Sequence, residues 1–447
     1  MDAGAVRRGL VDSGIRGEVI GREHREFDTA RRVWNGLTDR QPAAVVRAAS
    51  TEDVVKSVRF AADHGLLLAI RGGGHSLPGL STCDDGIVLD LRALNTIDID
   101  PVGRSATVGG GCRLGDMDRA TVAHGLVTPA GVVSHTGVGG LTLGGGMGWL
   151  SRRLGLSIDS LTGVEIVLAD GRIMNIDAEV DPELFWGLRG GGGNFGVVTA
   201  FRFRLHELGS VVIGQWHYGL PDAIAILGRY ADLAEAAPRE LTSAFTVTSG
   251  GLNVTAVWSG PAAGALDGVA AFGRIGAPIA ASLGEQSFLG LQSRGDEHLR
   301  WGRRVYAKGG FFGTLDEHMT EVIAAGASTA PSADSEIYVL RLGGAIKDVD
   351  DMATAYTGRA AEHYWIVEPV WDEPPDDDRC LAWGRGVARS LSVLSIAGNY
   401  VNEQADADRG VAEQAYGLDT YRRLATLKAR LDPGNTFRLN QNIAPAS

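Results

Sequence analysis

One histidine of this chain stands where its side chain could act as a nucleophile. It lies in a polar run that follows the apolar segment 66–70, namely Arg71-Gly72-Gly73-Gly74-His75-Ser76. A neutral imidazole carries a nitrogen lone pair that can attack an electrophilic carbon. From its position alone, His75 could equally be a polar turn residue or a contact to a phosphate.

Glycine gathers in three tracts that could hold an anionic group. Most of the clustering falls between residues 72 and 196, in the tracts 72–74, 137–148 and 189–196. Each tract is expected to begin where an apolar strand ends. Glycine exposes backbone N–H groups without a Cβ in the way, which suits a pyrophosphate. Any single tract could be a tight turn, but three together favour a large dinucleotide held by several loops. The glycine spacing of a dinucleotide-binding crossover near the N-terminus is missing.

Alternating short strands and helices must position these tracts. Strands are predicted over 44–48, 66–70, 87–91, 106–109 and 197–205, with helices over 51–65 and 114–125. The segments 164–169 and 171–177 form a predicted hairpin across Asp170-Gly171. The pattern is typical of an α+β lobe.

The character of the chain changes after His206, where glycine thins out. The sequence predicts strands over 211–218, 243–247, 252–259 and 336–342, and helices over 221–236, 261–275, 347–359 and 419–431. Such a switch marks a domain boundary. Two domains also agree with the length of 447 residues, which exceeds what one hydrophobic core usually supports.

Composition argues against several classes of partner. The formal net charge of −12 would repel nucleic-acid phosphates and anionic membranes. Three scattered cysteines are too few for a disulfide framework or a metal cluster. No apolar run approaches the length of a membrane span, and charges interrupt the N-terminus where a signal peptide would be apolar. We therefore expect a cytoplasmic protein with no metal, no nucleic-acid partner and no membrane association.

Several motifs together resemble one family. The run 71–76 resembles the flavin-attachment loop of the berberine bridge enzyme-like branch of the vanillyl-alcohol oxidase/PCMH-type FAD proteins. The likeness spans nearly the whole chain and also includes 131–149, 181–196, Tyr400-Val401-Asn402, Asp432-Pro433-Gly434-Asn435 and Asn440-Gln441-Asn442. It implies an FAD-binding lobe built from residues 1–206 and the returning segment 398–447. Residues 207–397 would form a substrate lobe whose antiparallel sheet is covered by helices.

The resemblance implies that His75 carries FAD through a covalent bond to the 8α-methyl carbon. That carbon becomes electrophilic when its methyl group loses a proton, and the bond anchors the cofactor and raises its potential. The implied cofactor-binding residues are Arg71, Gly72, Gly73, Gly74, His75, Ser76, Gly79, Val132, Val133, Ser134, Thr136, Gly137, Gly139, Gly140, Leu141, Gly144, Gly145, Gly148, Trp149, Gly196, Val197, Val198, Tyr400, Asn402, Asn440 and Asn442.

Three positions depart from the pattern of many relatives. Val133 stands where a second tether, a cysteine, would bond the flavin, so a single covalent bond is expected. Thr136 replaces the aliphatic residue that admits or blocks dioxygen, and its hydroxyl could orient dioxygen or hydrogen-bond the flavin. Glu403 replaces a tyrosine base of plant relatives. It is either the base here or a solvated acidic residue, and Tyr400 is the better candidate for flavin contact.

These features predict oxidation of a small organic molecule, with hydride transfer to FAD and reoxidation by dioxygen to hydrogen peroxide. Glu336 and Tyr338 would share one face of a strand, either at the site or as a pair on a half-exposed edge. Residues 363–365 could line a pocket or fill a core. The candidate catalytic residues are Glu403, Tyr400, His135, Thr136, Glu336 and Tyr338.

The sequence is also compatible with other functions. His135, Thr136 and Leu141 beside a single tether resemble bacterial polyketide-tailoring members, including the favorskiiase type that uses an oxygenated flavin. A dehydrogenase with another electron acceptor and a non-catalytic flavin carrier are the remaining readings. The substrate, whether polyketide, sugar, phenol or alkaloid, and the oligomeric state are not determined by the sequence.

Overall fold

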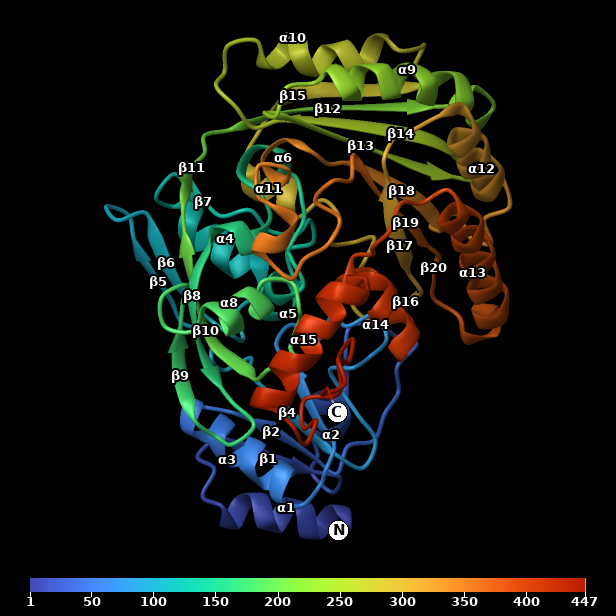
Figure 1. Cartoon of the computed structure of the whole chain (residues 1–447). Helices are drawn as coiled ribbons and strands as arrows, with labels where there is room; N and C mark the ends of the chain where they lie inside the picture. The colour runs from blue at the N-terminus through green and yellow to red at the C-terminus, as the bar shows by residue number, and fades with distance from the viewer. Residues whose placement is uncertain (447) are drawn as a thin grey trace.

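The computed structural model describes residues 1–446 and contains three main β-sheets (Figure 1). The first sheet has the order β1-β2-β4-β3, in which β2, β4 and β3 are parallel and β1 is antiparallel to β2. Its strands are β1 (Glu18–Gly21), β2 (Ala44–Arg47), β3 (Leu68–Arg71) and β4 (Ile87–Asp90). Helices α1 (Ala3–Asp12) and α3 (Thr51–Asp63) pack on it through valine and leucine side chains.

The second sheet is antiparallel and has the order β5-β6-β10-β8-β9. Its strands are β5 (Ile97–Asp100), β6 (Ser105–Gly109), β8 (Leu161–Val167), β9 (Ile173–Ile176) and β10 (Val197–Arg204). The hairpin predicted across Asp170-Gly171 is formed by β8 and β9, and Gly171 takes a φ of 79° that favours glycine. A short ladder joins β7 (Leu126–Val127) to β11 (His206–Glu207).

The third sheet is antiparallel, with seven strands in the order β15-β12-β14-β13-β18-β19-β17. All of them come from residues 211–368: β12 (Val211–Tyr218), β13 (Leu241–Thr248), β14 (Gly251–Trp258), β15 (Ala280–Gln286), β17 (Lys308–Phe312), β18 (Glu336–Arg341) and β19 (His363–Glu368). A two-stranded ladder of β16 (Arg304–Val305) and β20 (Val370–Trp371) lies beside it.

The two faces of this sheet differ in character because side chains alternate along each strand. Apolar residues such as Ile337, Val339 and Trp365 form a core with helices. The helices are α9 (Ala223–Ala236), α10 (Ala265–Ala270), α12 (Glu317–Ser328) and α13 (Asp377–Val393), which cover the outer side in Figure 1. The opposite face carries Glu336, Tyr338 and Tyr364 toward the rest of the molecule.

The C-terminal segment returns to the first two sheets, so that both chain ends lie in the same part of the molecule (Figure 1). Helix α15 (Leu418–Leu431) packs against α8 (Pro182–Leu188), and α14 (Arg409–Tyr416) precedes it. The buried Lys428 ammonium fixes the turn after α15, since it donates to Asp432 Oδ2 and to the carbonyls of Asn194 and Phe437.

The α+β fold class is confirmed, and three local predictions are wrong. Residues 347–359 form only a short 3₁₀ turn over Asp351–Ala353, because Gly343, Gly344 and Gly358 take positive φ around it and Arg359 is drawn to Asp159. Contrary to the prediction, two glycine tracts do not begin at the end of a strand. The third tract follows helix α8, and the second leads into a short helix, α5 (Val138–Leu143). Of the three tracts, only the first begins directly at the end of a strand of a main sheet.

Candidate active site

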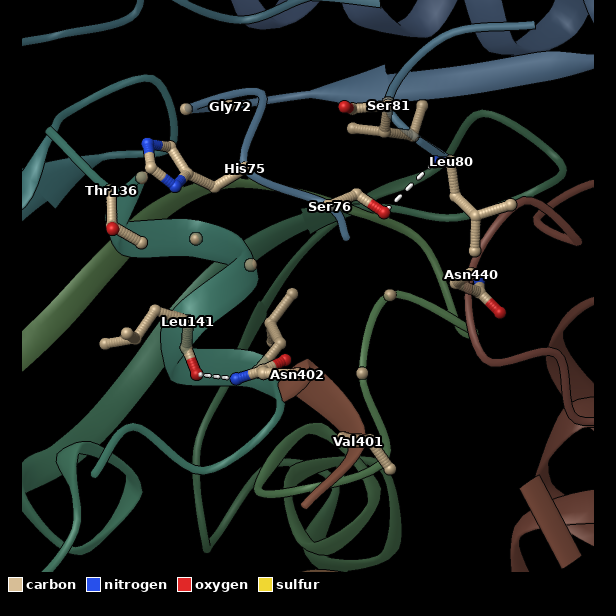
Figure 2. Close-up of a pocket in the computed structure, with 18 of the residues that line it drawn as sticks. Gly72, His75, Ser76, Leu80, Ser81, Thr136, Leu141, Val401, Asn402 and Asn440 are labelled. Carbon is tan, nitrogen blue, oxygen red and sulfur yellow. Dashed lines mark hydrogen bonds between the residues drawn. The ribbon is translucent and has the colours of Figure 1, made fainter. Parts of the chain in front are cut away.

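A long cavity lies where the three glycine tracts meet the C-terminal segment and the inner face of the seven-stranded sheet. The tracts contribute backbone to its wall, and the sheet contributes Glu368. Predicted site residues that line it are Gly72, Gly73, Gly74, His75, Ser76, Val132, Val133, Thr136, Gly137, Gly139, Gly140, Leu141, Gly196, Val197, Val198, Tyr400, Asn402, Glu403 and Asn440. Figure 2 shows several of them converging on this space.

Two glycine loops approach each other so closely at the cavity that side chains are excluded. A Cβ on Gly73 would lie 2.2 Å from the Gly137 nitrogen, and a Cβ on Gly137 would lie 2.3 Å from the Gly73 nitrogen. Gly74 adopts a φ of 75°, which favours glycine. These contacts fix the backbone that presents His75.

The His75 imidazole is held by three aromatic neighbours. Its ring stacks on Trp34 at a centroid distance of 4.6 Å, and Trp301 meets it edge-on. Its Nε2 lies 2.7 Å from Nδ1 of His135. Burial, with a smaller contribution from His135 and Arg113, lowers the pKa of His75 well below its usual range. The imidazole is therefore neutral near pH 7 and keeps a lone pair on one nitrogen.

The hydrogen bonds around His135 indicate which nitrogen that is. His135 Nε2 lies 3.4 Å from the backbone oxygen of Asp296, so this nitrogen carries the proton and Nδ1 accepts. His75 Nε2 then donates to His135, and the lone pair of His75 is on Nδ1. The Asp296 carboxylate accepts from the backbone N–H and the hydroxyl of Ser134, which holds this arrangement in place.

Helix α5 and the loop after it form a second side of the site. A Cβ on Gly140 would meet nothing within 4 Å, because this glycine faces the cavity. Asn402 donates to the Leu141 carbonyl at 2.9 Å (Figure 2) and to the Tyr400 hydroxyl at 2.9 Å. The Tyr400 hydroxyl also accepts from the Gly146 backbone N–H. The Tyr400-Asn402 pair therefore ties the C-terminal segment to α5.

The third tract and the C-terminus leave polar atoms without partners. Asn194 donates to the carbonyls of Gly191 and Gln441 and accepts from Ile443 N–H, which closes the loop. A Cβ on Gly193 would meet only open space. The buried Asn440 Oδ1 and Gln441 Oε1 have no hydrogen-bond partner, and both residues line the cavity. Buried polar atoms without partners indicate a site for a polar ligand.

Carboxyl and phenol groups gather at the sheet end of the site. Glu403 Oε2 is buried without a hydrogen-bond partner, and burial raises the pKa of Glu403 to about 7, although the Tyr364 hydroxyl partly opposes this. Burial also raises the pKa of Glu336 to about 7 and that of Glu368 well above its usual range. The pKa values of Tyr338 and Tyr400 are raised as well, so both phenols stay protonated.

Some predicted site residues lie behind the cavity wall. Arg71 is fully buried and donates to Asp90 at 2.8 Å, so its side chain supports the loop from below. Gly79 packs on Thr38, and a Cβ on Gly144 would strike Asn402. The predicted residues outside the cavity lining are Arg71, Gly79, Ser134, His135, Gly144, Gly145, Gly148, Trp149, Glu336, Tyr338 and Asn442.

Glu336 and Tyr338 do share a face of β18, as the alternation predicts. The alternative placement at a sheet edge is wrong, because β18 lies between β13 and β19. Of residues 363–365, which could line a pocket or fill a core, Tyr364 and Trp365 take different roles. Tyr364 faces Tyr400 with ring centroids 5.9 Å apart, whereas Trp365 belongs to the core under the helices.

Several residues of the site carried no signal in the sequence. Trp34 and Leu299 line the cavity beside His75, and Glu368 lines its sheet end. Glu368, Glu336 and His298 offer ligand-type atoms that all lie within 4.8 Å of one another, so they could hold a cation. Glu368 could have been found from the sequence only if the strand had been predicted to extend to residue 368. Side chains alternate along a strand, so Tyr364, Ile366 and Glu368 then share one face.

Comparisons with known proteins agree with this geometry. A family model described as an FAD binding domain matches residues 42–177, and one described as berberine and berberine like matches residues 399–444. An FAD-linked oxidoreductase of Dictyostelium discoideum is 32% identical over 437 residues, which are 96% of this chain and 95% of the relative.

Solved structures extend the likeness to the whole fold. The 6-hydroxy-D-nicotine oxidase of Arthrobacter nicotinovorans is 28% identical with a TM-score of 0.89, covering 97% of this chain and 99% of that one. Physcomitrella patens BBE-like 1, at 22% identity, shares the fold with a TM-score of 0.90 and covers 99% of both chains. No helix in the described residues combines the length and the hydropathy of a membrane span. The chain therefore belongs to the berberine bridge enzyme-like FAD-linked oxidoreductases of the vanillyl-alcohol oxidase/PCMH-type flavoproteins.

Proposed function

We propose that this enzyme is an oxidase that holds FAD covalently through His75, oxidises a small organic molecule and passes the electrons to dioxygen. The observation that carries the proposal is a neutral, desolvated imidazole and a buried carboxyl group of raised pKa on the wall of one cavity, His75 and Glu403 respectively. The first suits covalent attachment of a cofactor, and the second suits proton removal from a substrate.

The residues present fit FAD. Gly140 and Gly193 leave space where a side chain would fill the cavity, and Asn440 and Gln441 offer unpartnered oxygens to a polar ligand. We assign residues 1–206 and 398–447 to the lobe that holds the cofactor and residues 207–397 to the lobe that covers the substrate. Val133 at the cavity wall has no thiol, which supports a single tether.

FAD, when bound, would supply the acceptor for a hydride from a substrate carbon. Glu403 would take the proton from the substrate, because a base with a pKa of about 7 is half ionised near neutral pH. Tyr400 would position Asn402 and α5 through its hydroxyl, which already accepts two hydrogen bonds. The Tyr364 hydroxyl next to the Glu403 carboxyl would help to hold that carboxyl in place.

The relatives support oxidase chemistry in general terms, since one of them is a 6-hydroxynicotine oxidase. Thr136 on the cavity wall is the feature that favours the second candidate, an oxygenating or rearranging enzyme of aromatic polyketide biosynthesis, because its hydroxyl could orient dioxygen. The third candidate is a dehydrogenase that uses an electron acceptor other than dioxygen.

Two measurements on the purified protein test the proposal. Acid precipitation should leave the yellow colour in the pellet, because a covalent bond survives unfolding. With a substrate, the oxidase should release one hydrogen peroxide per molecule oxidised, and added dye should not be needed. Colour lost to the supernatant would refute the tether, and turnover that requires dye would favour the dehydrogenase. Incorporation of labelled dioxygen into the product would favour the oxygenating enzyme.

A further inference from the structure

Two glutamates lie directly opposite each other on neighbouring strands of the seven-stranded sheet. Glu336 on β18 and Glu368 on β19 are directly paired in the antiparallel register, so their side chains lie side by side on the same face of the sheet. Glu368 lines the cavity, and Glu336 lies next to it outside the lining. Like charges in directly opposite positions destabilise a sheet. A pair in which Glu368 is buried and Glu336 is half-buried indicates that something offsets the charge of the two carboxylates when the protein works.

No basic side chain of the described residues neutralises the pair. No lysine or arginine nitrogen between residues 1 and 446 forms an ion pair with either carboxylate, and the nearest basic group is His298, whose Nε2 lies 3.7 Å from Glu336 Oε2. Burial lowers the pKa of His298, so this ring is neutral near pH 7. The neighbouring Asp334 is already paired with Arg303.

The polar atoms around the pair are unpartnered. Glu368 is only 8% exposed, has no hydrogen bond within residues 1–446 and lines the cavity that also holds His75 and Glu403. The hydroxyl of Tyr338 and Nε2 of His298 are buried without partners. Two unpartnered polar groups, one phenol and one imidazole nitrogen, thus accompany the two carboxyl groups, and no cationic side chain of the described residues joins them.

We propose that the Glu336-Glu368 pair binds the positively charged nitrogen of the substrate, which makes the substrate of this oxidase a protonated organic amine. The inference rests on the proposed function and narrows its substrate class. An ammonium group would supply N–H donors to both carboxylates, and its carbon skeleton could extend along the cavity toward Glu403. The phenol of Tyr338, two residues along β18 from Glu336 on the same face, would lie beside the cation.

The raised pKa values of the two carboxyl groups fit a cation that binds reversibly. Without a cation, burial raises the pKa of Glu336 to about 7 and that of Glu368 well above its usual range, so the empty pair is partly protonated. A bound ammonium would lower both pKa values and restore the charges. The titratable groups around the pair are Glu403, His298, Asp334, Tyr338 and Tyr364.

The test compares three probes of equal size on the FAD-loaded enzyme: benzylamine, benzyl alcohol and benzoate. Binding is followed by the change in the visible flavin spectrum at about pH 8, where Glu336 is ionised and an aliphatic ammonium remains protonated. We expect benzylamine to bind roughly 10- to 100-fold more tightly than benzyl alcohol, as for a hydrogen-bonded charge. Failure of benzylamine to bind, or equal binding of the two, would overturn the proposal.

Two single variants test whether the glutamate pair causes the preference for benzylamine. Glu336→Gln and Glu368→Gln should each reduce the preference for benzylamine, and Glu321→Gln, which removes the same charge from the exposed face of α12, should not. Retained covalent flavin, measured by intact mass, shows that the variants fold. A preference that survives both glutamine variants would overturn the proposal.

A metal ion is the competing occupant. Zinc chloride alone, added to metal-free enzyme, should change neither the spectrum nor benzylamine binding. Tight zinc binding that is lost in Glu336→Gln and that blocks benzylamine would assign the pair to a metal instead. Colour lost on acid precipitation, or turnover that requires dye, would count against the proposed function and leave the amine preference to be judged separately.

Discussion

Burial has opposite consequences at the two ends of the cavity. At the first glycine loop it lowers the pKa of an imidazole, His75, and leaves a neutral nucleophile. At the sheet it raises the pKa of Glu403 and Glu336 to about 7 and leaves groups that gain or lose a proton near neutral pH. In both places the low-polarity surroundings disfavour the charged form. One physical effect would therefore prepare one end for the proposed covalent bond and the other for the proposed reversible binding of protons and a cation.

The two ends also differ in how they are held. His75 is fixed by Trp34 and by a hydrogen-bonded chain through His135 to Asp296. At the carboxyl end, Glu336 lies 3.7 Å from the neutral His298 and pairs with no lysine or arginine of residues 1–446, and one Glu403 oxygen is buried without a hydrogen-bond partner. A rigid environment suits a bond that forms once, whereas unsatisfied groups suit a ligand that enters and leaves in every cycle.

The largest effect is expected at the histidine end. His75→Ala should abolish covalent FAD completely, because no other nucleophile of the described chain occupies its position on the cavity wall. Intact mass should lack the increment of the cofactor, and acid precipitation should release all colour. His124→Ala, which changes an exposed histidine, should keep the full mass. Retained covalent flavin in His75→Ala would place the tether elsewhere.

At the carboxyl end, Glu403→Gln should lower kcat/KM by about 10²- to 10⁴-fold, the usual contribution of a positioned base. The covalent flavin content should be unchanged, since the two ends act independently. Steady-state peroxide release with an amine substrate provides the measurement, with Glu373→Gln as an exposed control. A larger loss in Tyr400→Phe than in Glu403→Gln would assign the base to Tyr400.

The pH dependence of kcat/KM should follow from the pKa of Glu403. Glu403 must be ionised to accept a proton, so kcat/KM should rise about tenfold per pH unit below 7 and level off above it. The acidic limb should disappear in Glu403→Gln. A pH-independent wild-type profile between about pH 5 and 8 would contradict the assignment.

A smaller effect is expected for the partner of His75. His135→Ala should slow flavin attachment by roughly tenfold without abolishing it, because it removes the acceptor that holds His75 with its lone pair on Nδ1. Time-resolved intact mass of the apoprotein mixed with FAD measures the rate. His135→Gln retains a hydrogen-bonding group and should restore part of it. A wild-type rate in both variants would remove His135 from the attachment.

The smallest effect concerns stability and comes from Glu336. The pKa of Glu336 is about 7 in the folded protein and about 4.5 in the unfolded chain, so ionisation of Glu336 opposes folding. The destabilisation is absent below about pH 4.5, grows as the pH rises to about 7 and is complete above it. Glu336→Gln should therefore raise the free energy of unfolding by roughly 1–3 kcal/mol at about pH 8 and by nothing at about pH 4. Thermal melts at both pH values measure the difference, and equal melts at about pH 8 would contradict it.

Predictions from the sequence succeeded where local chemistry decides the structure. The run around His75, the Asp170-Gly171 turn and the helix over 419–431 depend on residues close in sequence, and the structure contains all three features. Residues 347–359 were misassigned because their helical periodicity was overridden by glycines at positive φ and by the ion pair of Arg359 with Asp159, 200 residues away in sequence.

The sequence by itself determined the family, the α+β class and the residues of the glycine loops, because each of these is encoded in short runs whose backbone needs are local. Only the tertiary structure decided that Trp34, His135 and Asp296 gather around His75, and that Glu336 and Glu368 lie opposite each other near Glu403. The physical reason is that strand register and the docking of distant segments depend on packing across the whole molecule, and desolvation, which shifts the pKa of each of these groups, exists only after that packing has formed.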